Sequence, residues 1–200
     1  MIFTKISGTG SYAPKKILTN QDLEKMVDTT DEWITERSGI KERHIASEGE
    51  KTSDFAYEAS LKALEMAGLA PDDIDLIIVC TVTPDYGFPA VSCIVKNKLG
   101  SKKAAAYDLS AGCTGLIYGM GTANAMIKSG LFKHILVVGA ETLTSIVNWD
   151  DRSTCVLFGD GAGAVVLSSS DKPGIIDFYI DADSKDAMEL SIPAGGSANP

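Results

Sequence analysis

The sequence lacks the closely spaced ligands that zinc sites and disulfide frameworks need. It contains only two histidines and four cysteines, and no two cysteines form a Cys-x-x-Cys pair. Neither a metal site nor a disulfide framework is therefore expected. Cys80 and Cys155 stand in apolar runs and are expected to be small buried hydrophobic residues. Free thiols fit a reducing cytoplasm.

Positive charge, aromatic side chains and long apolar runs are also scarce. The 27 acidic residues outnumber the 18 lysines and arginines, which gives a formal net charge of −9, and 7% of residues are aromatic. This composition argues against nucleic acid and anionic membranes as main partners. No apolar run approaches the about 20 residues of a membrane-spanning helix, and no signal peptide is visible. We therefore expect a cytoplasmic protein.

Strand and helix patterns alternate along the chain and predict one α/β domain with a largely parallel sheet covered on both faces. At 200 residues and 44% hydrophobic content, the chain can build a substantial core. The expected strands are residues 4–9, 74–82, 104–108, 134–140, 154–158, 164–168 and 174–180. The expected helices are residues 20–27, 30–37, 53–67, 88–99 and 113–130.

Cys113 is the strongest candidate for a catalytic residue. It follows an expected strand, lies among small residues such as Gly112 and Gly115, and precedes an expected helix. The unpaired N–H groups and the dipole at a helix N-terminus stabilise a thiolate. Small neighbours let a substrate approach the sulfur closely. A buried, inert cysteine is the alternative, but the position favours a nucleophile.

Trp33 and Arg37 stand four residues apart and are expected to share one face of a helix capped by Thr30. An indole beside a guanidinium suits a nucleotide, because the ring can stack on a base while arginine binds a phosphate. Spacing alone equally allows a core tryptophan and a solvated arginine. Further positive charge is expected nearby from Lys41, Arg43 and Arg152.

Two other patterns are expected to be structural. The glycine-rich segment 159–163 precedes an apolar, strand-like run rather than a helix, so it does not fit a dinucleotide-binding fingerprint. We interpret it as a tight corner between two strands that shapes a neighbouring site. His44, in an expected turn, and His134, at a strand start, are likewise interpreted as structural.

Four motifs occur in an order that resembles β-ketoacyl-[acyl carrier protein] synthase III, a condensing-enzyme family of the thiolase fold. They are Asp31-Glu-Trp-Ile, Ser38-Gly-Ile-Lys-Glu-Arg-His44, Asp108-Leu-Ser-Ala-Gly-Cys113-Thr-Gly and Phe158-Gly-Asp-Gly-Ala-Gly-Ala164. The resemblance extends from residue 1 to about residue 193. It implies a layered αβαβα architecture of which this chain supplies the first βα half.

The resemblance also implies a reaction that starts fatty acid synthesis. Cys113 would take a short acyl group from acyl-CoA, and malonyl-[acyl carrier protein] would condense with it, with loss of carbon dioxide, to give a 3-ketoacyl product. The backbone N–H of Cys113 would help stabilise the oxyanion. The resemblance assigns Thr29, Trp33, Arg37 and Arg152 to CoA and Phe88, Leu143, Phe158 and Leu190 to the acyl pocket. No cofactor is implied beyond the CoA substrate, and a homodimer is expected, with Phe88 reaching across its interface.

Members of this family have a second, similar half that carries a catalytic histidine and asparagine. We expect residues 1–170 to be the first half and residues 171–200 the start of the connection to the second, and the sequence to be part of a longer protein. Two alternatives stay open. One is another thiolase-fold enzyme, such as a polyketide starter synthase or a thiolase. The other, if the 200 residues are the whole protein, is a non-catalytic acyl-CoA-binding or dimer scaffold.

Overall fold

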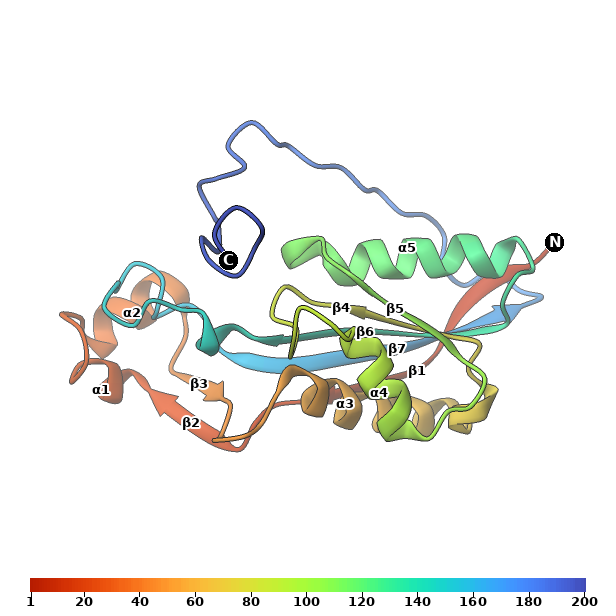
Figure 1. Cartoon of the computed structure of the whole chain (residues 1–200), viewed down its shortest axis with the longest axis horizontal. Coiled ribbons are helices and arrows are strands. Elements are labelled where there is room, and N and C mark those ends of the chain that lie inside the picture. Colours follow the sequence, from red (N-terminus) through yellow and green to blue (C-terminus); the bar gives the residue numbers. More distant parts are fainter.

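The computed structural model describes residues 1–200 and contains a five-stranded mixed sheet (Figure 1). The sheet order is β1-β7-β6-β4-β5. β4 is parallel to β5 and β6, whereas β7 is antiparallel to both β6 and β1, so the prediction of a largely parallel sheet is wrong. The strands are β1 (Phe3–Tyr12), β4 (Leu76–Cys80), β5 (Ala105–Leu109), β6 (His134–Thr142) and β7 (Asp160–Ser170).

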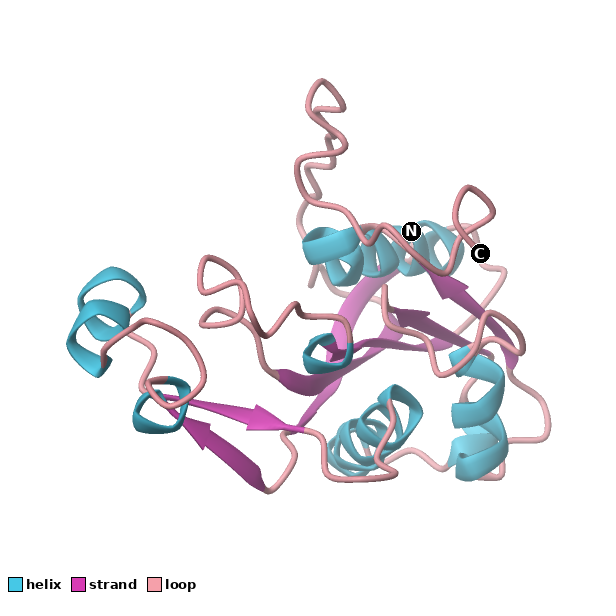
Figure 2. Ribbon diagram, turned by 60° about the vertical axis from the view of Figure 1, so that its left-hand side comes forward, coloured by secondary structure: helices cyan, strands magenta, loops and turns pink.

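Helices cover both faces of this sheet, as the alternating pattern predicts (Figures 1 and 2). α3 (Thr52–Ala67) and α4 (Val91–Leu99) lie on one face, and α5 (Gly115–Lys128) lies on the other. β4 is buried along its whole length, so it reads as a continuous apolar run rather than an alternating one. Its alternate side chains enter two separate clusters, one beneath α3 and α4 and one beneath α5.

α3 packs against β1 at unusually short range, because two glycines of β1 face it. A Cβ atom built on Gly8 would lie 2.1 Å from the carbonyl oxygen of Ala63, and one built on Gly10 would lie 2.2 Å from that of Ala59. No larger side chain fits at either position without moving the helix. The alanines of α3 therefore contact strand backbone directly, and the first core cluster is tightly packed.

A smaller unit projects from one end of the sheet and contains a two-stranded antiparallel sheet, β2 (Lys16–Thr19) with β3 (Glu42–Ile45) (Figure 1). Two short helices join these strands, α1 (Asn20–Leu23) and α2 (Asp31–Ser38). The Thr30 hydroxyl accepts a hydrogen bond from the Trp33 N–H, and α2 ends at Gly39 with φ of +73°. Both ends of α2 are therefore confirmed as predicted.

Four secondary-structure predictions are wrong. Residues 154–158 form turns instead of a strand, and the glycine-rich segment predicted as a corner is instead the beginning of one continuous strand, β7. His44 lies in β3 rather than in a turn. The strand predicted at residues 174–180 is absent. The sequence analysis did not predict β2 and β3. Each has only four residues, which mix charged and apolar side chains and so show no clear alternation.

Other predictions are confirmed with shifted boundaries. The helix predicted from residue 88 begins at Val91, and that predicted to reach residue 27 ends at Leu23. The helix after Cys113 is preceded by a short 3₁₀ turn, η2 (Gly112–Thr114). Two further 3₁₀ turns are η1 (Pro71–Asp73) and η3 (Leu143–Ser145).

Residues 171–200 extend over α5 without a helix or strand (Figure 1). The Tyr118 hydroxyl of α5 donates to the carbonyl of Asp181, and the side chain of Ile180 lies near Gly121. Along the whole chain, no helix combines the length and the apolar character required to cross a membrane.

Candidate active site

Cys113 lies where the sequence predicts, between a strand and a helix. β5 ends at Leu109, η2 carries the cysteine, and α5 starts two residues later at Gly115. Gly112 has φ of +54°, a conformation that favours glycine, so the turn before the cysteine depends on this residue. The Cys113 side chain is exposed. An exposed thiol at the entrance to a 14-residue helix is positioned to act as a nucleophile.

The other cysteines differ from Cys113 in exposure or in position. Cys80 and Cys155 are buried, as predicted, whereas Cys93 is exposed on α4. Burial is the main cause that raises the pKa of Cys80 to about 12, and burial also raises the pKa of Cys155. Both buried thiols therefore stay protonated and unreactive near neutral pH.

This difference predicts a selective labelling pattern. Iodoacetamide at pH 8 is expected to modify Cys113 and Cys93 in the native protein but leave Cys80 and Cys155 unmodified, because it reacts with accessible thiolates. Peptide mass spectrometry after a short exposure measures this. The same reagent added in urea should reach all four cysteines. Modification of Cys80 without urea would contradict the packing described for β4.

Trp33, Arg37 and Arg152 come together on the projecting unit, although residue 152 is far from the others in sequence. The guanidinium carbon of Arg37 lies 4.5 Å from the centre of the Trp33 ring, and that of Arg152 lies 5.1 Å from it. Trp33 is half-buried, so its ring is accessible beside two cations. Arg152 also donates to the carbonyl oxygen of Asp28 and lies 3.7 Å from its carboxylate, a contact that no sequence pattern predicts.

Two further residues of this region behave differently from each other. The Thr29 hydroxyl oxygen is buried and has no hydrogen-bond partner within the protein. Arg43, expected to add positive charge near Trp33, is buried, with only 4% of the residue exposed. Its guanidinium donates to the carbonyl of Val156 and to the side-chain oxygen of Asn20, which ties β3 to the chain before β7.

Of the four residues assigned to the acyl pocket, the structure brings only two to the same place. Leu143 and Phe158 are half-buried at the same end of the sheet, since Thr142 of β6 pairs with Asp160 of β7. Phe88 is 89% exposed on the loop between β4 and α4. Leu190 is 73% exposed within residues 171–200, so in this structure it lines no pocket with the others.

Carboxylates hold both ends of the loop between β4 and α4 in place, a role that the sequence analysis missed. The Asp108 carboxylate of β5 accepts hydrogen bonds from the backbone N–H groups of Val91 and Ser92 at the start of α4, with N···O distances of 2.7 and 2.8 Å. Glu141 of β6 accepts from the Val82 N–H at 2.9 Å and from the Thr83 hydroxyl. These acids fix both ends of the loop that carries Phe88.

The two histidines lie outside this arrangement. His44 Nδ1 contacts the Pro14 carbonyl, and His134 Nδ1 lies 2.8 Å from the Ser168 hydroxyl. Burial is the main cause that lowers the pKa of His134. Both therefore have partners within the fold, and neither forms a hydrogen bond with Cys113.

Sequence comparison agrees with this architecture. The sequence model of 3-oxoacyl-[acyl-carrier-protein (ACP)] synthase III matches residues 107–184. Over 196 residues, the chain is 57% identical to the β-ketoacyl-[acyl-carrier-protein] synthase III of Caldanaerobacter subterraneus subsp. tengcongensis, covering 98% of this chain and 59% of the relative. Over nearly its whole length, the chain is similar to members of the β-ketoacyl-[acyl carrier protein] synthase III family. It spans about three fifths of the length of the curated relatives that it matches.

Solved structures of synthase III and of a related enzyme have the same fold. The 3-oxoacyl-[acyl-carrier-protein] synthase III of Aquifex aeolicus VF5 aligns with a TM-score of 0.83 and 55% identity, over 84% of this chain and 55% of that chain. The priming β-ketosynthase of the R1128 polyketide pathway aligns with a TM-score of 0.84 and 40% identity, over 86% of this chain and 52% of that chain. The predicted thiolase-like α/β fold is confirmed by these alignments.

Proposed function

We propose that this chain carries the nucleophile and the acyl-CoA site of a synthase that starts fatty acid synthesis. The carrying observation is Cys113, exposed at the entrance to α5 in a chain similar to members of the synthase III family. The Cys113 thiolate attacks the thioester carbonyl of acetyl-CoA or another short acyl-CoA, and CoA leaves as its thiolate. Backbone N–H groups near Cys113 stabilise the oxyanion formed in this attack.

The second half-reaction uses malonyl-[acyl carrier protein]. Its malonyl group loses carbon dioxide, and the carbanion attacks the carbonyl of acyl-Cys113. The cysteine leaves as a thiolate, and 3-ketoacyl-[acyl carrier protein] is released. The CoA thioester is a substrate here, and we propose no additional cofactor.

For CoA recognition, we propose a site on α2 and the neighbouring loops. The adenine stacks between Trp33 and Arg152, Arg37 binds phosphate, and Thr29 contributes from the residue before the helix cap. Arg152 lies too close to the indole to admit a base, because a ring between two planes needs twice the stacking distance. CoA binding therefore requires Arg152 to move away from Trp33 and Asp28.

For the acyl group, we propose a pocket formed by Phe88, Leu143, Phe158 and Leu190. Leu143 and Phe158 already lie at the same end of the sheet. Phe88 is 89% exposed and Leu190 is 73% exposed, so both side chains must become covered by other residues before they can line a pocket. We propose that Phe88 is covered in this way by the partner subunit of a homodimer.

The remaining parts of the proposal concern the whole protein. Residues 1–170 are proposed to be the first half of the thiolase-like fold, and residues 171–200 the start of the connection to a second half. That half would supply the catalytic histidine and asparagine and much of the acyl carrier protein surface. We also propose a cytoplasmic location.

The decisive experiment is an intact-mass measurement on the protein expressed from its whole gene, with and without acetyl-CoA. A gain of one acetyl group, mapped to Cys113 by peptide analysis, is the expected result. A chain that binds CoA but never becomes acylated would instead favour a non-catalytic acyl-CoA-binding scaffold. A chain that neither gains an acetyl group nor binds CoA would overturn both the synthase and the scaffold proposals.

A polyketide starter synthase is the second candidate, and the 40% identity to the R1128 priming ketosynthase supports it. Both enzymes form an acyl-cysteine, so acylation does not separate them. The two enzymes are separated by comparing their turnover with carrier proteins of the fatty acid type and of the polyketide type. A thiolase would instead condense acyl groups without any carboxylated extender.

Trp33→Ala is predicted to weaken CoA binding by about 1–3 kcal/mol, the usual contribution of base–aromatic stacking. Isothermal titration with CoA measures this change. Trp33→Phe is the matched control, since it retains an aromatic face and should lose clearly less affinity. Equal affinity of wild type and Trp33→Ala would show that the indole serves the core of the projecting unit rather than the nucleotide.

A further inference from the structure

Asp160, the first residue of β7, accepts three hydrogen bonds from two distant segments. One carboxylate oxygen accepts the Ala46 N–H at 2.7 Å and the Thr144 hydroxyl at 2.5 Å, and the other accepts the Thr144 N–H at 2.9 Å. The residue is 8% exposed, and no lysine or arginine forms a salt bridge with it. Protein N–H and O–H groups therefore bind this carboxylate instead of a cation.

The two segments held by Asp160 belong to different parts of the proposed site. Thr144 lies in η3, directly after Leu143. Ala46 follows β3 and so belongs to the unit that carries Trp33. Phe158 precedes Asp160 by two residues, on the chain that enters β7. The carboxylate thus connects two residues of the proposed acyl pocket with the end of the nucleotide-binding unit.

The residues beside Asp160 explain why the segment is rich in glycine. A Cβ on Gly159 would lie 3.1 Å from the His44 carbonyl oxygen, and one on Gly161 would lie 3.1 Å from that of Tyr12. Both contacts are tighter than an ordinary van der Waals contact, so glycine lets β3 and β1 approach the start of β7 closely. This approach brings the Ala46 N–H within reach of Asp160.

We propose that Asp160 is a positioning residue that fixes Leu143 relative to Phe158 and thereby sets the acyl-chain selectivity of the enzyme. This inference rests on the proposed function. Ala46 and Thr144 offer three donors, two N–H groups and one hydroxyl. All three are satisfied only by a side chain whose two terminal atoms both accept hydrogen bonds, as the carboxylate oxygens do. An asparagine replaces one acceptor by a donor and leaves at least one N–H without a partner.

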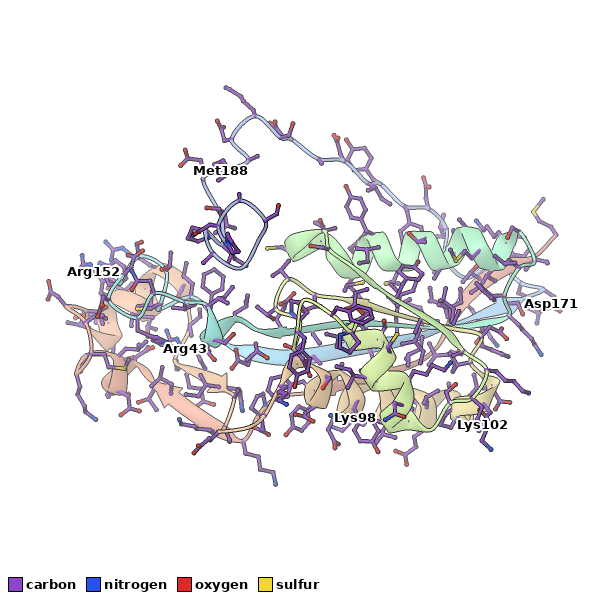
Figure 3. All side chains as sticks on the ribbon, in the orientation of Figure 1. Arg43, Lys98, Lys102, Arg152, Asp171 and Met188 are labelled. Carbon is purple, nitrogen blue, oxygen red and sulfur yellow. The ribbon has the colours of Figure 1, made fainter.

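The test is Asp160→Asn in the full-length protein, with Cys113 acylation rates measured for acetyl-, butyryl- and hexanoyl-CoA. We expect the ratio between the best and the poorest substrate to fall at least about threefold, since a loosened pocket discriminates chain length less. Asp171→Asn is the matched control. Asp171 follows the opposite end of β7 and is exposed, so its variant should keep the wild-type ratio (Figure 3).

Thr144→Ala supplies a second variant that removes one hydrogen bond and keeps the carboxylate. It should lower the same ratio by a smaller factor than Asp160→Asn. An equal loss of rate for all three substrates in both variants would show a merely structural role and overturn the inference. An unchanged ratio in both would overturn it as well.

Amide hydrogen exchange separates this inference from the proposed function. In Asp160→Asn, the amide at Thr144 or Ala46, whichever loses its acceptor, should exchange roughly tenfold faster than in wild type. Unchanged exchange at both amides would overturn the positioning role alone. If the wild-type protein takes no acyl group from any substrate, the proposed function is wrong, and the selectivity role is overturned with it.

Discussion

Cys113→Ala is expected to abolish acyl transfer, lowering the rate of acyl-enzyme formation by roughly 10³-fold or more. The exposed thiol at the entrance to α5 is the proposed attacking group, and alanine offers no atom that forms a thioester. Intact-mass spectrometry after incubation with acetyl-CoA measures the acylated fraction. CoA affinity should stay within about threefold of wild type, since Trp33 and the two arginines are unchanged.

Cys93→Ala is the matched control for this experiment. Cys93 is also an exposed cysteine near the start of a helix, but it lies within α4 rather than after β5. Its variant should acylate at the wild-type rate. Persistent acylation of Cys113→Ala would assign the nucleophile to another residue. Loss of CoA binding in that variant would point to a structural role for Cys113.

Gly8→Ala is expected to cost about 3 kcal/mol of the free energy of unfolding, at the upper end of typical overpacking effects. The new Cβ would lie 2.1 Å from the Ala63 carbonyl oxygen and 2.7 Å from the Ala67 backbone nitrogen. Because both atoms belong to helix backbone, relief requires α3 to move as a whole away from β1. The urea midpoint, followed by circular dichroism, measures the change.

Gly163→Ala provides the comparison on the neighbouring strand. Gly163 pairs with Ser11 of β1, but a Cβ at this position meets no atom within 4 Å. Its variant should change the free energy of unfolding by less than about 0.5 kcal/mol. Equal effects of the two substitutions would mean that glycine flexibility, rather than contact with α3, determines the loss at Gly8.

The parts of the site that depend on neighbours in sequence were predictable. Cys113 could be placed between a strand and a helix because small residues and an apolar run mark both. Trp33 and Arg37 could be placed on one helical face because helix geometry relates residues four apart. Thr30 and Gly39 mark the ends of that helix by the same local chemistry.

The parts that depend on contacts between distant segments were missed. The sequence predicts Arg43 only as further positive charge near Trp33, yet in the fold it is buried and donates to the carbonyl of Val156, 113 residues away. β7 starts within a glycine-rich segment that favours a turn. There, the close backbones of β1 and β3 make glycine the residue that fits. Backbone proximity of this kind leaves no periodic signal.

The sequence by itself determined most helices and strands of the main sheet, the position of Cys113 before its helix, and the similarity to synthase III. These follow from periodicity, capping residues and motif order, which are properties of short stretches of chain. Only the tertiary structure decided that Arg152 contacts Asp28 and that Asp160 joins Ala46 to Thr144. The physical reason is that hydrogen bonds and stacking act over a few ångströms in space, whatever the separation in sequence.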